Sequence, residues 1–303
     1  MILHHYKLSP FSEKIRLMFG YCDMNWSSAI SPAMPPRPIV DPLAGGYRRI
    51  PVAQLGADIF CDSRIITSEI ADLCGRPEMA MENCSKEIQT FVAHIDSTVF
   101  MAIVKSGKPL KSMGLLLTNL LPWQAYRFIK DRAGIGKTSS LPRISQSKAL
   151  EVVQQCKADL EDKLSNNLFL FGDTPTIADF STYHVFWFAK SIISSKPFEG
   201  FPKADAWLNR MSEMGHGQST RMFKGKAFAA AASSEPRAIA KTMLKHELIG
   251  SAVEIKPSDY AKDAVRGTLV GSSDLRWVLA RQSDKFGTLH VHFPKSGFEL
   301  NEV

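Results

Sequence analysis

The chain has 303 residues, of which 45% are hydrophobic and 22% are charged, a globular composition long enough for two or three domains. No apolar run reaches the length of a membrane span, and the first residues lack the pattern of a signal peptide. The net charge is +7, but Lys and Arg are interleaved with acidic residues and form no basic block. We therefore expect a cytoplasmic protein with neither a membrane nor a nucleic-acid partner.

Residues 1–76 alternate between strand and helix signals. ILHHYKL predicts a strand, and SPFSEKIRLMFGY predicts a helix because Ile15, Met18 and Phe19 recur at helical spacing. A second strand in NWSSAIS, a loop rich in proline and glycine, two short strands flanking Gly56 and a second helix complete the pattern. This order predicts a small domain of strands and helices.

After that domain the sequence pattern changes twice, first to helical periodicity and then to strand-like alternation. Residues 82–230 are helical, with a long amphipathic helix in EIQTFVAHIDSTVFMAIVK and an apolar helix in TIADFSTYHVFWFAKSII. In residues 231–303 an Ala/Ser-rich connector leads into alternating runs such as AVRGTLVG, LRWVLARQ and TLHVHF. These predict a linker helix and a small β-rich, barrel-like domain, with an open sheet as the alternative to a barrel. The chain is therefore expected to be an α+β multidomain protein.

The cysteines and a histidine pair bear on metal and disulfide chemistry. The cysteines are Cys22, Cys61, Cys74, Cys84 and Cys156. They are odd in number and contain no C-x-x-C pair, which argues against a disulfide framework or a zinc ribbon and suits a reducing compartment. His290 and His292 lie two apart on a predicted strand, but no third ligand is near. We expect hydrogen-bonded histidines and no metal site.

Four local motifs carry a family resemblance. They are S-P-F-S-x-K-I-R-L at 9–17, R-I-P-V-A-Q-L at 49–55, D-S-R-I-I at 62–66 and G-D-T-P-T-I-A-D-F at 172–180. In this order and spacing they resemble the glutathione transferase superfamily, in particular its serine-type members. The resemblance covers about residues 1–220. It implies a thioredoxin-like glutathione-binding domain at 1–76 and an all-helical domain at 82–230. The β-rich tail is an atypical extension of that fold.

Ser9 has two interpretations. A serine before a proline at a helix start is a common N-cap, which is purely structural. The same hydroxyl could donate to a thiolate at the positive end of the helix. Lowering a thiol pKa of about 8.5 by about two units requires about 2.7 kcal/mol. The resemblance implies that Ser9 is catalytic. Tyr6 on the preceding strand is the alternative hydroxyl, or a packed aromatic, and Ser12 is a weaker candidate.

The other site residues are also assigned by the resemblance. It implies that the bond between Ile50 and Pro51 is cis, although only about 5–6% of X-Pro bonds are, and that the Ile50 main chain pairs with the cysteinyl part of glutathione. Asp62 and Ser63 can cap the helix that follows them. By resemblance they hold the γ-glutamyl end, with Asp62 where many members carry Glu.

The glycyl carboxylate of glutathione requires a cationic or amide donor. Arg49 is the first candidate, and Arg37 and Arg48 lie in or beside the same loop. Each of these three arginines could equally well be a solvated surface residue. The loop at 31–47 departs from the family pattern, so no donor can be aligned. Thr176 and Asp179 form a capping box, which we interpret as structural.

The resemblance implies a glutathione transferase that transfers alkyl or aryl groups other than methyl, with a role in detoxification. Glutathione would be its co-substrate, and no metal would be needed. A small hydrophobic electrophile would bind between the domains, where Phe11, Phe100, Met101, Val104 and Leu116 are possible walls. A homodimer is implied. The alternative is a non-catalytic protein-interaction or regulatory module on the same fold, which the β-rich tail and the altered loop would suit.

Overall fold

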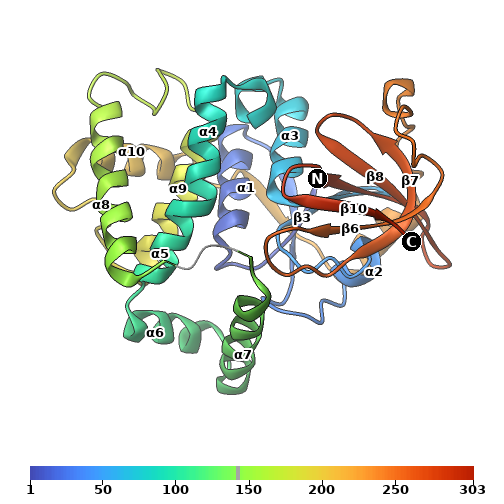
Figure 1. The fold of residues 1–303 in the computed structure, drawn as a ribbon, viewed down its shortest axis with the longest axis horizontal. Helices are drawn as coiled ribbons and strands as arrows, with labels where there is room; N and C mark the ends of the chain where they lie inside the picture. The colour runs from blue at the N-terminus through green and yellow to red at the C-terminus, as the bar shows by residue number, and fades with distance from the viewer. Residues whose placement is uncertain (141–143) are drawn as a thin grey trace.

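One twisted sheet joins the two ends of the chain, in the strand order β10-β6-β7-β8-β9-β4-β3-β1-β2-β5. The computed structural model describes residues 1–140 and 144–303. The strands are β1 (Ile2–His5), β2 (Asn25–Ile30), β3 (Val52–Leu55), β4 (Asp58–Cys61), β5 (Gln218–Arg221), β6 (Ala252–Pro257), β7 (Val265–Ser272), β8 (Arg276–Ser283), β9 (Gly287–Pro294) and β10 (Phe298–Glu302). Figure 1 shows the sheet on one side of the molecule and most helices on the other.

The N-terminal part has the thioredoxin-like arrangement. Strand β1 pairs in parallel with β2 and antiparallel with β3, and β3 and β4 form a hairpin. The helices are α1 (Pro10–Tyr21), the short α2 (Val40–Ala44) and α3 (Ser63–Cys74). Side chains alternate across the sheet, so Leu3, Ala53 and Phe60 join the core with α1 and α3, whereas Val52 and Ile59 join a second core with the C-terminal strands.

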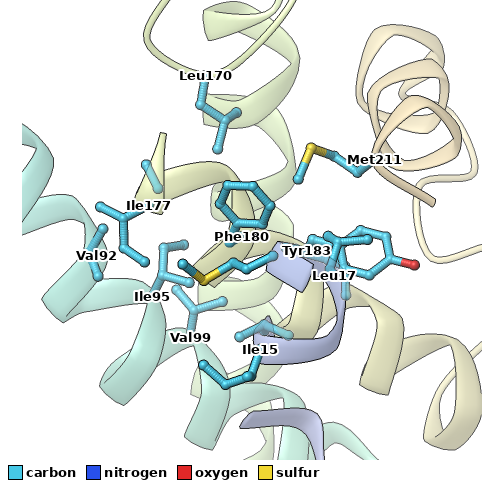
Figure 2. Packing of buried hydrophobic residues seen from close by; sticks show 14 of the residues in the cluster. Ile15, Leu17, Val92, Ile95, Val99, Leu170, Ile177, Phe180, Tyr183 and Met211 are labelled. Carbon is cyan, nitrogen blue, oxygen red and sulfur yellow. The ribbon is translucent and has the colours of Figure 1, made fainter. Parts of the chain in front are cut away.

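The middle of the chain is helical. It contains α4 (Lys86–His94), the π-helical turn η3 (Ile95–Val99), α5 (Phe100–Ser106), α6 (Pro109–Asn119), α7 (Pro122–Thr138), α8 (Gln146–Lys163), α9 (Ile177–Ile192) and α10 (Pro202–Glu213). In Figure 2, Ile15 and Leu17 of α1 lie against Phe180 and Tyr183 of α9. The two parts therefore share one core. Within the described ranges, no helix is long and apolar enough to cross a membrane.

The capping box at the start of α9 is confirmed. Asp179 accepts hydrogen bonds from the Thr176 N–H at 2.9 Å, and the Thr176 hydroxyl accepts from the Ala178 N–H. Asp179 also accepts from the Leu170 N–H and the Trp207 indole N–H, each at 2.9 Å. The motif thus anchors α9 to α10 and to the preceding loop, and it carries no chemistry.

The C-terminal strands extend the N-terminal sheet instead of closing a separate barrel. Strand β9 pairs in parallel with β4, which would otherwise be an edge strand with unpaired N–H and C=O groups. Residues 218–232, which the sequence groups with the helical part, also return to this sheet. Strand β5 pairs with β2, and Ala227 of α11 (Lys224–Ala232) packs against Ile2.

Charged groups tie the extension to α3 and β4. The His292 imidazole lies 2.7 Å from Asp58, and the Arg237 N–H donates to the same carboxylate at 2.9 Å. Burial alone would raise the pKa of Asp58, but these two hydrogen bonds outweigh it and lower that pKa. Arg237 and Arg276 both pair with Glu69 of α3. His292 is therefore a hydrogen-bonded residue, and the described residues contain no group of three or more His, Cys, Asp or Glu that could hold a metal.

The backbone of α1 at Gly20 lies very close to that of residues 214–215, and this contact gives a prediction about stability. A Cβ on Gly20 of α1 would lie 2.2 Å from the Gly215 carbonyl oxygen and 2.4 Å from that of Met214. We expect Gly20→Ala to lower the free energy of unfolding by about 2 kcal/mol, because neither backbone can yield without disturbing the core. Gly225→Ala in α11 is the matched control, because its Cβ meets nothing within 4 Å. It should raise stability by about 0.5 kcal/mol. Urea unfolding of both variants tests this, and equal stabilities would contradict it.

Candidate functional site

The strand register brings the predicted site residues to the same end of strands β1, β3 and β4. His4 of β1 pairs with Val52 of β3, and Val52 pairs with Cys61 of β4. The residues that follow β1, precede β3 and follow β4 therefore lie together at the same end of these three strands. These are the segments that hold Ser9, Ile50 with Pro51, and Asp62 with Ser63.

Ser9 is the N-cap of α1. Its hydroxyl oxygen accepts from the Ser12 N–H at 3.2 Å and from the Ser12 hydroxyl at 2.9 Å. Both bonds use lone pairs of Ser9, so its own proton stays available for donation. Accepting a hydrogen bond also polarises an O–H group and makes it a better donor. Capping and donation to a thiolate are thus compatible here, although the Ser9 residue is only 2% exposed.

Tyr6 lies in the turn between β1 and α1. Its carbonyl oxygen accepts from the Ser9 N–H at 3.1 Å, and its side chain affects the electrostatics of Arg37. Burial lowers the pKa of Arg37 to about 10. Arg37 donates to the carbonyl oxygens of Pro32, Ala33 and Arg48, so it holds the loop in shape.

The peptide bond between Ile50 and Pro51 is cis, as the resemblance implied, and Pro35–Pro36 is cis as well. Pro51 is buried and Ile50 is partly exposed. Within the described residues, no main-chain hydrogen bond involves Ile50. Its N–H and C=O groups are therefore free to pair with an extended ligand, as an additional strand would.

The start of α3 holds two of the predicted site residues, Asp62 and Ser63. Asp62 is the N-cap and accepts from the Arg64 N–H at 3.0 Å. It adopts φ +85°, a conformation that costs energy in a residue with a Cβ and that is often found at functional sites. The Ser63 hydroxyl has no hydrogen-bond partner among the described residues, and the Ser63 residue is 8% exposed. Unpaired main-chain N–H groups at a helix start favour a carboxylate.

Arg49 is already occupied by the C-terminal extension. Its guanidinium pairs with the Asp259 carboxylate and donates to the Tyr260 carbonyl oxygen, and it stacks 3.9 Å from the centre of the Tyr260 ring. Arg48 pairs with Asp131 of α7. None of the three candidate arginines is therefore a solvated surface residue.

The segment that occupies Arg49 is the loop at 258–264, between β6 and β7. It is held from the other side by Ser140, whose N–H donates to the Asp259 carbonyl oxygen at 2.9 Å and whose hydroxyl contacts the Ser258 carbonyl oxygen. Sequence reasoning missed this loop, because Asp259 lies 210 residues from Arg49 and no local pattern signals the pairing.

An aromatic wall adjoins Ser9 on the side of the helical domain. The Phe11 ring lies 5.0 Å from that of Phe100 and 4.8 Å from that of His184, measured between centroids. The Lys14 ammonium contacts Asp96 at 2.7 Å, and Asp96 lies on the π-helical turn η3. Burial and the charge of Lys14 lower the pKa of His184 to about 3, so this imidazole is neutral. Of the predicted pocket walls, Phe11 and Phe100 are in contact, whereas Val104 is exposed.

A separate groove of about 1070 Å³ lies between α4, η3 and α8. Its lining includes Phe91, His94, Cys156 and Lys163 but none of the predicted site residues. The groove is therefore not part of the candidate site.

Comparisons with known proteins agree with this geometry. The family model described as glutathione S-transferase, N-terminal domain, matches residues 3–78, and the corresponding C-terminal domain model matches residues 128–214. A solved GST-like protein from Pseudomonas syringae is 28% identical, with a TM-score of 0.79 over 100% of this chain and 98% of its own. That alignment includes the C-terminal extension.

Two more distant structures share only part of the chain. A glutathione S-transferase from Rhodospirillum rubrum is 18% identical with a TM-score of 0.47, covering 70% of this chain and 87% of its own. FzlA from C. crescentus is 16% identical with a TM-score of 0.47, covering 78% and 93%. No curated protein matches the sequence.

Proposed function

The chain belongs to the glutathione S-transferase superfamily, and we propose that it is a glutathione-dependent transferase acting on small apolar electrophiles. The observation that carries this proposal is the hydroxyl of Ser9. Its lone pairs are engaged by Ser12, its proton is free, and it lies at the positive end of α1. That arrangement suits the stabilisation of a thiolate.

Glutathione fits the site as an extended peptide. The γ-glutamyl carboxylate would meet the Ser63 hydroxyl and the start of α3, and the cysteinyl main chain would pair with Ile50 beside the cis Pro51. The sulfur would then lie near Ser9. It loses its proton to water, accepts a hydrogen bond from Ser9, and attacks an electrophilic carbon held against Phe11 and Phe100 while the leaving group departs with its bonding electrons.

The glycyl end of glutathione would compete with the protein itself. Asp259 presents a carboxylate to Arg49, which is the group that a glycyl carboxylate would present. In this proposal glutathione displaces Asp259 from Arg49, so the loop at 258–264 moves when the co-substrate binds. The apparent affinity is then lowered by the fraction of molecules in which Arg49 is occupied.

This competition gives a test of the site. Asp259→Ala should tighten glutathione binding about three- to tenfold, which is the effect of removing an internal competitor worth about 1 kcal/mol. Asp263→Ala is the matched control: it removes a carboxylate from the same loop, but that carboxylate lies 4.0 Å from Arg48 and not on Arg49. Calorimetric titration of the two variants with glutathione measures this difference in affinity. Unchanged or weaker binding by Asp259→Ala would show that Arg49 does not hold glutathione.

The proposal extends to a cytoplasmic homodimer with a role in detoxification. All five cysteines are free thiols, which suits a reducing compartment. Because the outer edge of β4 is paired with β9, a second copy would dock on other surfaces.

One observation favours a different function, that of a non-catalytic interaction module. Helices α6 and α7 lie at the bottom of the view in Figure 1. They expose large apolar side chains. Leu110 is 88% exposed, Tyr126 67% and Trp123 60%. A patch of this kind can mark a protein-binding surface. A chain that binds no glutathione but forms a stable complex through α6 and α7 would fit this second function.

A further inference from the structure

Four sulfur atoms gather where α1 and α3 end, away from the predicted site residues. The Cys74 sulfur lies 3.5 Å from that of Met24, and the Cys22 sulfur lies 4.0 Å from that of Met79. After burial, the neighbouring Cys74 thiol is the next cause that raises the pKa of Cys22, which links the two pairs. The four residues come from segments that are far apart in sequence, since Cys22 and Met24 follow α1 whereas Cys74 ends α3 and Met79 ends η1 (Pro77–Met79).

Two tight turns produce this gathering. Cys22 is the C-cap of α1, and Asp23 adopts φ +46°, so the chain reverses and Met24 returns toward the helix. Gly75 ends α3 in the left-handed region at φ +63°, which carries the chain into η1 and places Met79 in the core. Met79 is fully buried, whereas Cys22, Met24 and Cys74 are partly exposed, so the cluster has access to solvent on one side.

We propose that Cys22, Met24, Cys74 and Met79 form a binding site for a soft monovalent metal ion, Cu(I). Thiolate and thioether ligands select Cu(I) over harder ions. Four sulfurs with metal–sulfur bonds of about 2.3 Å would stand about 3.8 Å apart in a tetrahedron. The two thiol–thioether contacts, at 3.5 Å and 4.0 Å, are close to that separation.

The surrounding charges suit a cation that deprotonates its ligands. The C-terminal ends of α1 and α3 both face this region and carry partial negative charge. Burial and the neighbouring Cys74 thiol raise the pKa of Cys22 to about 12, so Cys22 is a thiol before metal binds. Because the cysteine ligands bind as thiolates, the complex has a net charge of −1, which the nearby Arg76 guanidinium offsets.

The test is an anaerobic competition between the full-length protein and a coloured Cu(I) chelator. The wild-type protein should withdraw one equivalent of Cu(I) from the chelator. The Cys22→Ser/Cys74→Ser variant should bind at least about a hundredfold more weakly, beyond the loss that an outer-shell partner causes. Met24→Leu should weaken binding without abolishing it. The thermal unfolding of each variant, recorded without metal, shows whether it folds.

The matched control is Cys84→Ser/Cys156→Ser, which removes two thiols outside the cluster and should bind like the wild type. Three results would overturn the proposal. They are failure of the folded wild type to compete with the chelator, equal affinity in the folded Cys22→Ser/Cys74→Ser variant, and an equal loss in the control.

Discussion

Replacing Ser9 with alanine should lower the rate of glutathione conjugation at pH 7 about three- to 25-fold and change glutathione affinity much less. The reason is the ionisation of the bound thiol. If its pKa rises from about 6.5 by one to two units, the thiolate fraction at pH 7 falls by that factor, and the thiolate loses about 1.4–2.7 kcal/mol of stabilisation. Affinity depends mainly on Ile50, Ser63 and Arg49, which the substitution does not touch.

The matched control separates this chemistry from the loss of a helix cap. Ser145 caps α8 in the same way, accepting from the Lys148 N–H at 3.2 Å. Ser9→Ala and Ser145→Ala should each lose about 1 kcal/mol of stability, but only Ser9→Ala should shift the pH–rate profile to higher pH. The thiolate absorbance of bound glutathione, followed against pH, measures the shift directly. If the pH–rate profile of Ser9→Ala is unchanged, Ser9 is only a helix cap and does not stabilise the thiolate.

The second large effect is the loss of stability in acid. His4, His5 and His184 are buried, and burial lowers their pKa values to about 4, 3 and 3. In the unfolded chain these imidazoles bind protons near pH 6.5. The unfolded state therefore binds more protons than the folded state below that pH, and stability falls as pH falls. Each histidine contributes about 1.4 kcal/mol per pH unit, so the limit for all three is about 4 kcal/mol per unit between pH 6.5 and 4.

Carboxylates add to this loss at lower pH. The folded pKa values of Asp58 and Asp96 are below normal, since their hydrogen-bonding and charged partners outweigh burial. Their stabilisation is present above about pH 4 and is lost as pH falls through the folded values.

Urea unfolding at pH 7, 6 and 5 measures the histidine effect. His184→Gln should reduce the pH dependence of the free energy of unfolding by about one proton, which is about 1.4 kcal/mol per pH unit. A total loss of less than about 1 kcal/mol between pH 6.5 and 5 would contradict this account.

The elements that depend on local pattern were predictable from sequence. The hairpin around Gly56, the helix that starts after Asp62 and the capping box at Thr176 and Asp179 all have signals within a few residues. The resemblance also implied that these motifs bind one ligand, and the strand register brings their segments to the same end of the sheet. Whether Ser9 caps or donates could not be decided from sequence, because that depends on which lone pairs Ser12 engages.

The C-terminal extension shows what local pattern cannot convey. Its strands were recognisable, but the pairing of β9 with β4 depends on an exposed strand edge more than 200 residues earlier. The occupation of Arg49 by Asp259 is equally remote. Long-range contacts of this kind join segments that carry no mutual sequence signal. The sequence therefore left a small barrel and an open sheet as alternatives and did not show that these strands extend the first sheet.

The most direct test of the proposed function is a calorimetric titration of the full-length protein with reduced glutathione. We predict saturable heat at micromolar to low millimolar ligand, with one site per chain and weaker binding of γ-glutamylcysteine, which lacks the glycyl carboxylate that Arg49 would meet. No heat at several millimolar from a folded protein would contradict the account and would direct attention to the exposed surface of α6 and α7.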